Sequence, residues 1–252
     1  MATRVREQKK FLISNVDYVY TIGTTVSKVV KGIINRDVPQ IFNCVTDPVA
    51  SKIVDSLDEP GKNMGGVGNI TPLDMQLKNA KKLINFQRLG VFHNPREHNS
   101  NLILDRLIAL EKKFQFEVTL LRVSPGNNRL QHLLSALNDG SISVDAVYLP
   151  GATYLLSQTE IIGKQLKQAK IKSIGGIERY MRYGVMMGTV SDYPELGRQA
   201  ARIIDRNQKG ESLDKIGIQT PPDFKLVINL TTAKELGVVI PPEILRTATI
   251  IE

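Results

Sequence analysis

Residues 88–100 read RLGVFHNPREHNS. The first six, Arg88–His93, form a short apolar run, and an amphipathic stretch of helical length, 99–114, follows the polar residues after it. Apolar runs of this kind, each followed by an amphipathic stretch, recur along most of the chain and predict strands that alternate with helices. Such alternation is typical of α/β proteins with parallel sheets that carry helices on both faces.

The same reading places elements outward from this stretch in both directions. Strands are expected at 16–22, 40–45, 88–93, 117–123, 145–149, 172–175, 185–190 and 225–230. Helices are expected at 26–34, 71–84, 99–114, 128–138, 154–168 and 193–207, with one more starting at 46–48 and short ones before 237 and after 242. The passage 65–69 reads as an extended, Gly-rich connection between two groups of elements. The two groups predict two lobes with a boundary near residue 86.

Composition narrows the classes of function. The chain has 252 residues and a formal net charge of +8, but its basic residues are spread out. The densest groups, at 4–10 and 78–82, lack interleaved aromatic residues, so they predict solvated helix faces rather than a nucleic-acid surface.

Cys44 is the single cysteine, which leaves no disulfide framework. Its apolar neighbours predict a buried strand position, with a reactive thiol as the alternative. No run has the length of a membrane span and the start lacks a secretion signal, so a complete chain would be cytoplasmic.

Small polar residues follow nearly every expected strand. Because ligands of parallel sheets bind beyond the carboxyl ends of the strands, these positions are the candidate site. Helix capping alone explains about half of them. The alternative is a ligand cleft, in which helix N-termini bind a carboxylate and Glu97 or Asp47 pairs with an ammonium group, as suits an amino acid. The positions lie at 23–25, 46–48, 94–100, 124–127, 150–153, 175–178 and 191–193.

Signatures of enzymes, cofactors and metal sites are weak. Gly66-Val67-Gly68 lacks the third glycine of a dinucleotide fingerprint, and no phosphate-binding loop or nucleophile elbow occurs. His93 and His98 are five residues apart, which is the wrong spacing for one helical face. We therefore expect no catalytic residue, no cofactor and no metal.

Several ordered motifs together resemble a bacterial family. They are Val45-Thr46-Asp47-Pro48-Val49-Ala50, Pro60-Gly61-x-Asn63, Gly90-Val91-x-x-Asn94-Pro95-x-Glu97-x-Asn99-Ser100, Asp192-Tyr193-x-Glu195-Leu196-Gly197, and Asp223-Phe224-x-Leu226-Val227-Ile228-Asn229-Leu230. Over about residues 16–252 the chain is similar to ABC-transporter substrate-binding proteins of the tryptophan/phenylalanine-binding-like group.

The resemblance implies a type I periplasmic-binding-protein fold: two Rossmann-like lobes that close by hinge motion on a small amino-acid-like ligand. Lobe 1 would be 1–86 with 191–224 returning to it, and lobe 2 would be 87–190 with 225–252. The protein would be a non-enzymatic, extracytoplasmic monomer that delivers its solute to ABC permease subunits and binds no nucleic acid. Ligand-binding positions would be Thr24, Thr25, Thr46, Asp47, Asn69, Glu97, Asn99, Ser100, Thr153, Glu178 and Asp192.

The chain departs from the family pattern in three places. A strand, a helix and a strand are expected before the helix at 4–13 and are absent, so we expect an N-terminally truncated first lobe, most simply as a fragment of a longer product. The passages 150–153 and 175–178 match loosely, which leaves the ligand open. Tyr154, Tyr180 and Tyr183 are candidates either for stacking on a ligand or for packing. A cytoplasmic ligand-sensing module of the same fold and a degenerate fragment are the alternative functions.

Overall fold

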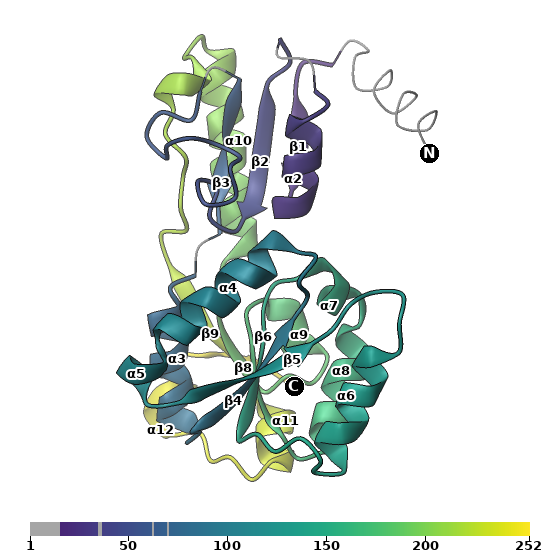
Figure 1. Ribbon diagram of the computed structural model, residues 1–252. Helices are drawn as coiled ribbons and strands as arrows, with labels where there is room; N and C mark the ends of the chain where they lie inside the picture. The colour runs from purple at the N-terminus through teal and green to yellow at the C-terminus, as the bar shows by residue number, and fades with distance from the viewer. Residues whose placement is uncertain (1–15, 35–36, 62, 70) are drawn as a thin grey trace. The chain divides into compact units, whose positions relative to one another are not determined.

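The computed structural model describes residues 16–34, 37–61, 63–69 and 71–252. The chain divides into two compact units (Figure 1). Unit 1 comprises residues 1–70 and 192–223, and unit 2 comprises residues 71–191 and 224–252. The chain therefore passes from one unit to the other three times. The helix expected at 4–13 lies outside the described residues.

The boundary between the units lies earlier than the expected position near residue 86. Helix α3 (Leu73–Leu83) belongs to unit 2. Its buried side chains Leu77 and Ala80 join one apolar cluster with Leu89 and Val91 of strand β4 (Arg88–His93). Because the apolar face of α3 is part of this core, the boundary falls at residue 70.

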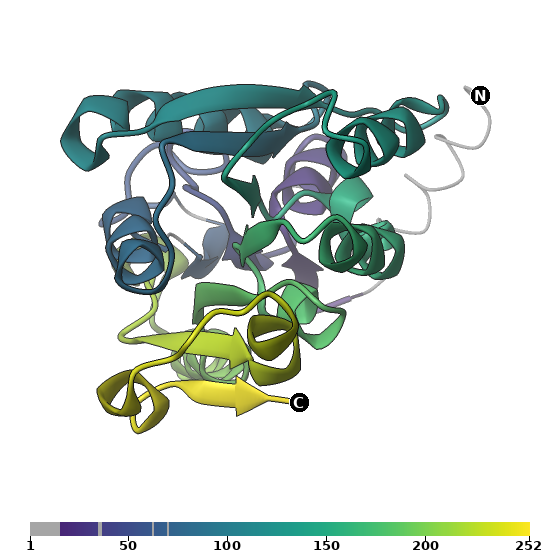
Figure 2. The ribbon, with the colours of Figure 1, turned by 90° about the horizontal axis from the view of Figure 1, so that it is seen from below.

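Unit 2 is built on a seven-stranded sheet in the order β10-β9-β8-β7-β6-β4-β5. The further strands are β5 (Glu117–Arg122), β6 (Ala146–Leu149), β7 (Lys172–Gly175), β8 (Met187–Ser191), β9 (Phe224–Asn229) and β10 (Thr249–Ile251). Strand β9 runs antiparallel to β8, and all other pairs are parallel. The sheet is thus mostly parallel, as expected, with β8–β9 as its one antiparallel pair among the described residues. Figure 2 shows β9 and β10, the yellow strands, side by side at one end of the sheet.

Helices cover both faces of this sheet because neighbouring side chains on its strands point to opposite faces. Ala146 and Tyr148 of β6 lie in one apolar cluster, and Val147 and Leu149 lie in another. Helices α3, α4 (His98–Ala109), α11 (Leu230–Glu235) and α12 (Pro242–Leu245) pack in the first cluster. Helices α6 (Arg129–Asn138), α7 (Thr153–Ser157), α8 (Thr159–Gln168) and α9 (Glu178–Arg182) pack in the second.

The helices expected at 99–114 and 154–168 are each divided in two. The first is α4 followed by α5 (Glu111–Phe114), and the second is α7 followed by α8. Helix α9 and strand β10 are two elements that were not expected from the sequence.

Unit 1 contains a parallel three-stranded sheet in the order β1-β2-β3. Its strands are β1 (Val19–Ile22), β2 (Gln40–Val45) and β3 (Met64–Gly68). Helix α10 (Tyr193–Gln208), green in Figure 1, lies along β2 and β3. With the 3-10 turn η1 (Leu213–Lys215), it contributes the apolar side chains that cover Ile41 and Val67.

The Gly-rich passage is strand β3 rather than an extended connection. Gly66 lies against β2 so closely that a Cβ atom there would be 2.3 Å from the carbonyl oxygen of Phe42. A strand can approach its neighbour in this way only without a side chain at that position.

No helix follows Thr46-Asp47-Pro48, which corrects the expectation of one. Residues 48–52 form turns, and Lys52 adopts the left-handed conformation with φ 57°. Ile53 and Val54 instead bury their side chains with Phe42 in a separate cluster of unit 1.

Helix α2 (Thr24–Lys31) faces the sheet of unit 1 with its polar side. Ser27 is fully buried and shares a 2.9 Å hydrogen bond with Oγ1 of Thr21, whereas Val26 and Val29 are more than half exposed. On the neighbouring strand β1, which within the described residues pairs only with β2, Ile22 is also exposed. Helix α2 and strand β1 therefore both carry exposed apolar side chains among the described residues.

Candidate functional site

The order of strands in unit 2 predicts where a ligand would bind. Strand β4 lies between β5 and β6, so the chain leaves it toward β5 and later returns on its other side to form β6. Open α/β sheets bind ligands beyond the carboxyl ends of strands at such a reversal. The passages at this point in unit 2 are 94–99, after β4, and 150–153, after β6.

Glu97 joins these two passages. Its side chain is nearly buried, with 8% of its surface exposed. Oε1 accepts hydrogen bonds from Nδ2 of Asn94 at 2.7 Å and from the backbone N–H of Tyr154 at 3.0 Å. Oε2 accepts one from the backbone N–H of Thr153 at 2.6 Å. The carboxylate therefore binds the first two N–H groups of helix α7.

Asn99 and Ser100 complete this frame from the first turn of α4, and both are buried. Nδ2 of Asn99 donates to the carbonyl oxygen of Gly151, which is a second link between the two passages. Oγ of Ser100 accepts from the backbone N–H of Asn94 at 3.0 Å. Asn94 was among the strand-end residues of the sequence but not among the binding candidates, and its signal is its place directly after β4.

The other candidates of unit 2 have different surroundings. Thr153 is exposed at the start of α7. Glu178, at the start of α9, forms ion pairs with Arg182 at 2.6 Å and with Lys225 at 3.7 Å. Its charge is therefore neutralised locally.

The three candidate tyrosines also differ from one another. Tyr180 is fully buried and its hydroxyl donates to the carbonyl oxygen of Pro150, so it packs in the core rather than stacking on a ligand. Tyr183 is exposed beneath the guanidinium of Arg179, and Tyr154 is half-buried at the start of α7.

In unit 1, the passages after β1 and β2 are tied together. Oγ1 of the buried Thr24 accepts from the backbone N–H of Thr46 at 3.1 Å. Thr25 is exposed in the first turn of α2. Asp47 is half-buried with a positive φ of 48°, and its Oδ1 accepts from the backbone N–H of Ala50 at 2.9 Å.

Asn69 and Asp192 lie at two further ends of unit 1 elements. Asn69 follows β3, its backbone N–H donates to the carbonyl oxygen of Val45, and its Nδ2 donates to the hydroxyl of Tyr193 at 3.4 Å. Asp192 is the N-cap residue of α10. Tyr193 was not among the binding candidates, although it directly follows Asp192 in the sequence. The two units thus each gather their candidates at strand ends, six in unit 1 and five in unit 2.

Cys44 is not the fully buried strand residue that its neighbours predict. It is half-buried and has a positive φ of 56°. Burial raises the pKa of its thiol to about 11, which opposes formation of the reactive thiolate. Among the described residues, no group of three or more His, Cys, Asp and Glu side chains is arranged to hold a metal ion.

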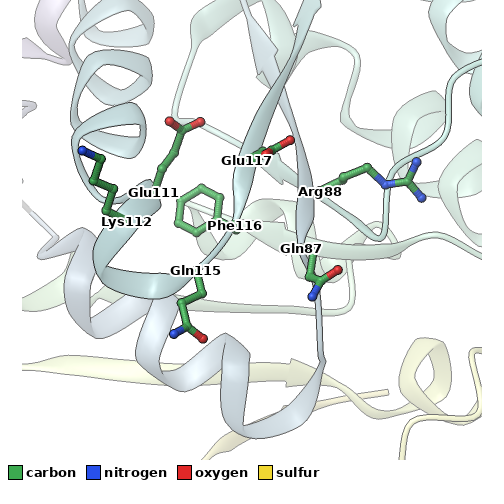
Figure 3. Close-up of a pocket in the computed structure, with 7 residues that line it drawn as sticks. All are labelled: Gln87, Arg88, Glu111, Lys112, Gln115, Phe116 and Glu117. Atoms are coloured by element: carbon green, nitrogen blue, oxygen red, sulfur yellow. The ribbon is translucent and has the colours of Figure 1, made fainter.

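A surface pocket of about 710 Å³ lies at the opposite end of β4 and β5 (Figure 3). Arg88 and Glu117, the first residues of these strands, line it beside the ring of Phe116. Because it lies at the amino ends of the strands, it is distinct from the candidate residues at 94–99 and 150–153.

The family model described as "ABC transporter substrate binding protein" matches residues 2–251. The "Tyrosine-binding protein" of Clostridioides difficile (strain R20291) is 28% identical over 237 residues, which cover 94% of this chain and 67% of that protein.

Among the described residues, no helix is long and apolar enough to span a membrane.

Two solved structures share the fold. One is a conserved domain protein from Vibrio cholerae, with a TM-score of 0.88 and 26% identity over 100% of this chain and 83% of that chain. The other is an ABC domain from Streptococcus pneumonia in complex with L-Trp, with a TM-score of 0.87 and 24% identity over 99% of this chain and 86% of that chain. Both the fold and the match over nearly its full length show that this chain belongs to the ABC transporter substrate-binding protein family, a family of solute-binding proteins rather than enzymes.

Proposed function

We propose that this chain is the solute-binding component of an ABC importer and that its solute is an amino acid. The observation that carries the proposal is the family match over residues 2–251. The relatives support the ligand class, since one is a tyrosine-binding protein and another holds L-Trp. Delivery to permease subunits, an extracytoplasmic location, a monomeric state and closure of a hinge on the ligand are parts of the same proposal.

The strand-end residues suit a zwitterion. An α-carboxylate needs N–H or hydroxyl donors, and an α-ammonium needs carboxylate or carbonyl acceptors. Hydroxyl groups stand at the exposed Thr25 and Thr153. Asp47, half-buried after β2, and Asp192, at the start of α10, are the carboxylates of unit 1 that we assign to the ammonium group.

Aromatic side chains near these positions suit an aromatic amino acid. Tyr154 and Tyr193 are both half-buried and each lies in the first turn of a helix that follows a strand end. An offset or edge-to-face ring contact contributes about 0.5–1.5 kcal/mol beyond the area that it buries. We therefore expect tyrosine, tryptophan and phenylalanine to bind more tightly than alanine or glycine.

A thermal-shift panel with the twenty common L-amino acids, followed by calorimetry on those that stabilise the protein, tests the proposal. Ligand at about 100 times its Kd adds about 2.7 kcal/mol to the free energy of unfolding, which raises Tm measurably. Asp47→Asn is expected to weaken binding at least tenfold, whereas Asp55→Asn, at an exposed position of the same unit, is expected to leave it unchanged. A panel in which no amino acid raises Tm at millimolar concentration would overturn the proposed ligand class.

Closure has its own measurement. Small-angle X-ray scattering with and without the bound amino acid is expected to show a smaller radius of gyration for the complex. An unchanged radius at saturating ligand contradicts closure while leaving the ligand class intact.

A further inference from the structure

The Glu97 carboxylate is already supplied with hydrogen-bond donors from within unit 2. A carboxylate has about four lone-pair sites, and Glu97 uses three of them for Asn94, Thr153 and Tyr154. With 8% of the residue exposed, little of its surface remains for a further partner. The Glu97 carboxylate therefore has a structural role within unit 2, and little of it is available to pair with a cation of a ligand.

Two of its donors explain why a charge is stable at this buried position. The backbone N–H groups of Thr153 and Tyr154 are the first two of helix α7, and N–H groups in a first turn have no partner within their own helix. Hydrogen bonds to an ionised acceptor are about twice as strong as neutral ones, which offsets the cost of burying the charge. Glu97 thus caps a helix that begins more than fifty residues later in the chain.

The same contacts determine where the passage after β6 lies. Glu97 holds it at Thr153 and Tyr154, and Asn99 holds it at the carbonyl oxygen of Gly151. Both residues come from the passage after β4, on the other side of the reversal in strand order. The relative position of these two passages therefore depends on Glu97 and Asn99.

We propose that Glu97 is a positioning residue that fixes Thr153 and the start of α7 in the solute-binding crevice, and that it does not pair with the ammonium group of the solute. This inference rests on the proposed amino-acid-binding function. It reverses the role that the sequence suggests for Glu97, and it leaves the ammonium group to carboxylates of unit 1.

The two roles differ in their dependence on the ligand's amino group. A counter-ion is needed by L-tyrosine but not by 3-(4-hydroxyphenyl)propionate, which lacks the ammonium group. A positioning residue is needed equally by both, because both use the same crevice. The second ligand pair is L-tryptophan and indole-3-propionate.

The first experiment measures Kd for both ligand pairs by calorimetry on wild type, Glu97→Gln and Glu97→Asp. Glutamine keeps the shape but turns an NH₂ group toward one backbone N–H, and aspartate keeps the charge but is shorter by one methylene. We expect each variant to weaken both members of a pair by the same factor, at least tenfold, so that their affinity ratio stays constant. Glu160→Gln, at an exposed position in the first turn of α8, is the matched control and is expected to bind as wild type does.

A loss confined to the amino acids in Glu97→Gln, with unchanged affinity for the propionates, would overturn the inference and make Glu97 the counter-ion. Unchanged affinity for all four ligands would overturn it as well.

The second experiment needs no ligand. Amide hydrogen exchange followed by NMR is expected to show that Glu97→Gln lowers protection at Thr153 and Tyr154 at least tenfold, while amides of β7 stay protected. Unaltered protection at both residues would contradict the proposal that Glu97 holds the start of α7. If wild type binds none of the ligands, the proposed function has failed, and the exchange measurement alone decides whether Glu97 anchors α7.

Discussion

The hydroxyl of Tyr148 donates a 2.7 Å hydrogen bond to Oε1 of Gln76, which joins β6 to α3 inside unit 2. Both side chains are buried, and burial raises the pKa of the Tyr148 hydroxyl, so it remains a donor at all physiological pH values. Tyr148→Phe leaves the Gln76 oxygen buried without this partner and is expected to lower the free energy of unfolding by about 1–3 kcal/mol. Urea denaturation followed by far-UV circular dichroism measures the loss.

The double variant Tyr148→Phe/Gln76→Leu distinguishes this bond from simple packing. Because it removes both polar partners, it is expected to be more stable than Tyr148→Phe alone. Additive losses from the two substitutions would show that the bond is not responsible.

Helix α2, which turns its polar side toward the sheet of unit 1, gives a second prediction. Ser27→Ala removes a buried hydroxyl that bonds to Thr21 Oγ1 and to the carbonyl oxygen of Gly23, so it is expected to cost about 1–2 kcal/mol. Val29→Ser, two residues further along the helix and 59% exposed, is expected to change stability by less than about 0.5 kcal/mol. Equal stability losses in the two variants would contradict this orientation of α2.

Cys44 provides a chemical test of burial in unit 1. With a pKa of about 11 against the ordinary 9.0, its thiolate fraction at pH 8 is on the order of a hundredfold smaller than in the unfolded chain. Labelling by a chromogenic disulfide reagent is therefore expected to be slow in the native protein and fast in denaturant. Labelling of the native protein as fast as that of a model peptide thiol would contradict the burial of the Cys44 thiol and its raised pKa.

Asp145 makes the stability of unit 2 depend on pH. Its Oδ2 accepts hydrogen bonds from the backbone N–H groups of Arg88 at 2.7 Å and of Gln87 at 2.8 Å, and the bond from Arg88 is the largest cause of its lowered pKa. A lowered folded-state pKa stabilises the protein above the unfolded value of 3.8, and this contribution disappears as the pH falls through the folded pKa.

Asp145→Asn is therefore expected to cost about 1 kcal/mol at pH 7, a figure reduced for the partial exposure of the carboxylate. The gap from wild type should narrow as the pH falls below about 4. Urea titrations across this range measure it, with Asp105→Asn, at an exposed position of α4, as the control. A gap that is constant with pH would mean that the charge of Asp145 contributes nothing.

Some strands were predictable because local signals agree there. The bounds of β2, β4 and β7 match the expected ranges, and β2 and β4 each combine a short apolar run with an Asx-Pro turn signal shortly after it. The helix expected after Thr46 failed because the same Asx-Pro signal starts a single turn as readily as a helix. Only the burial of Ile53 and Val54 against Phe42, a tertiary contact, decides between them.

The strand-end positions of the candidate residues could be predicted from the sequence, but their hydrogen-bond partners could not. The strand-end rule finds Glu97, Asn99 and Thr153 because it depends only on the direction of the strands. The partners of Glu97 are backbone N–H groups far along the chain, and no spacing or composition reveals them. For the same reason the sequence does not distinguish a carboxylate that caps a distant helix from one that binds a cation.

The three passages of the chain between the units bear on the order in which the protein folds. The five parallel strands β4 to β8 come from one continuous stretch of unit 2, whereas β2 of unit 1 is covered by α10, which follows that whole stretch. Bringing α10 to β2 closes a loop that contains most of unit 2, and this entropy cost is smaller once that loop is compact. Unit 2 is therefore expected to refold first, and the refolding rate of unit 1 is expected to follow that of its inserted neighbour.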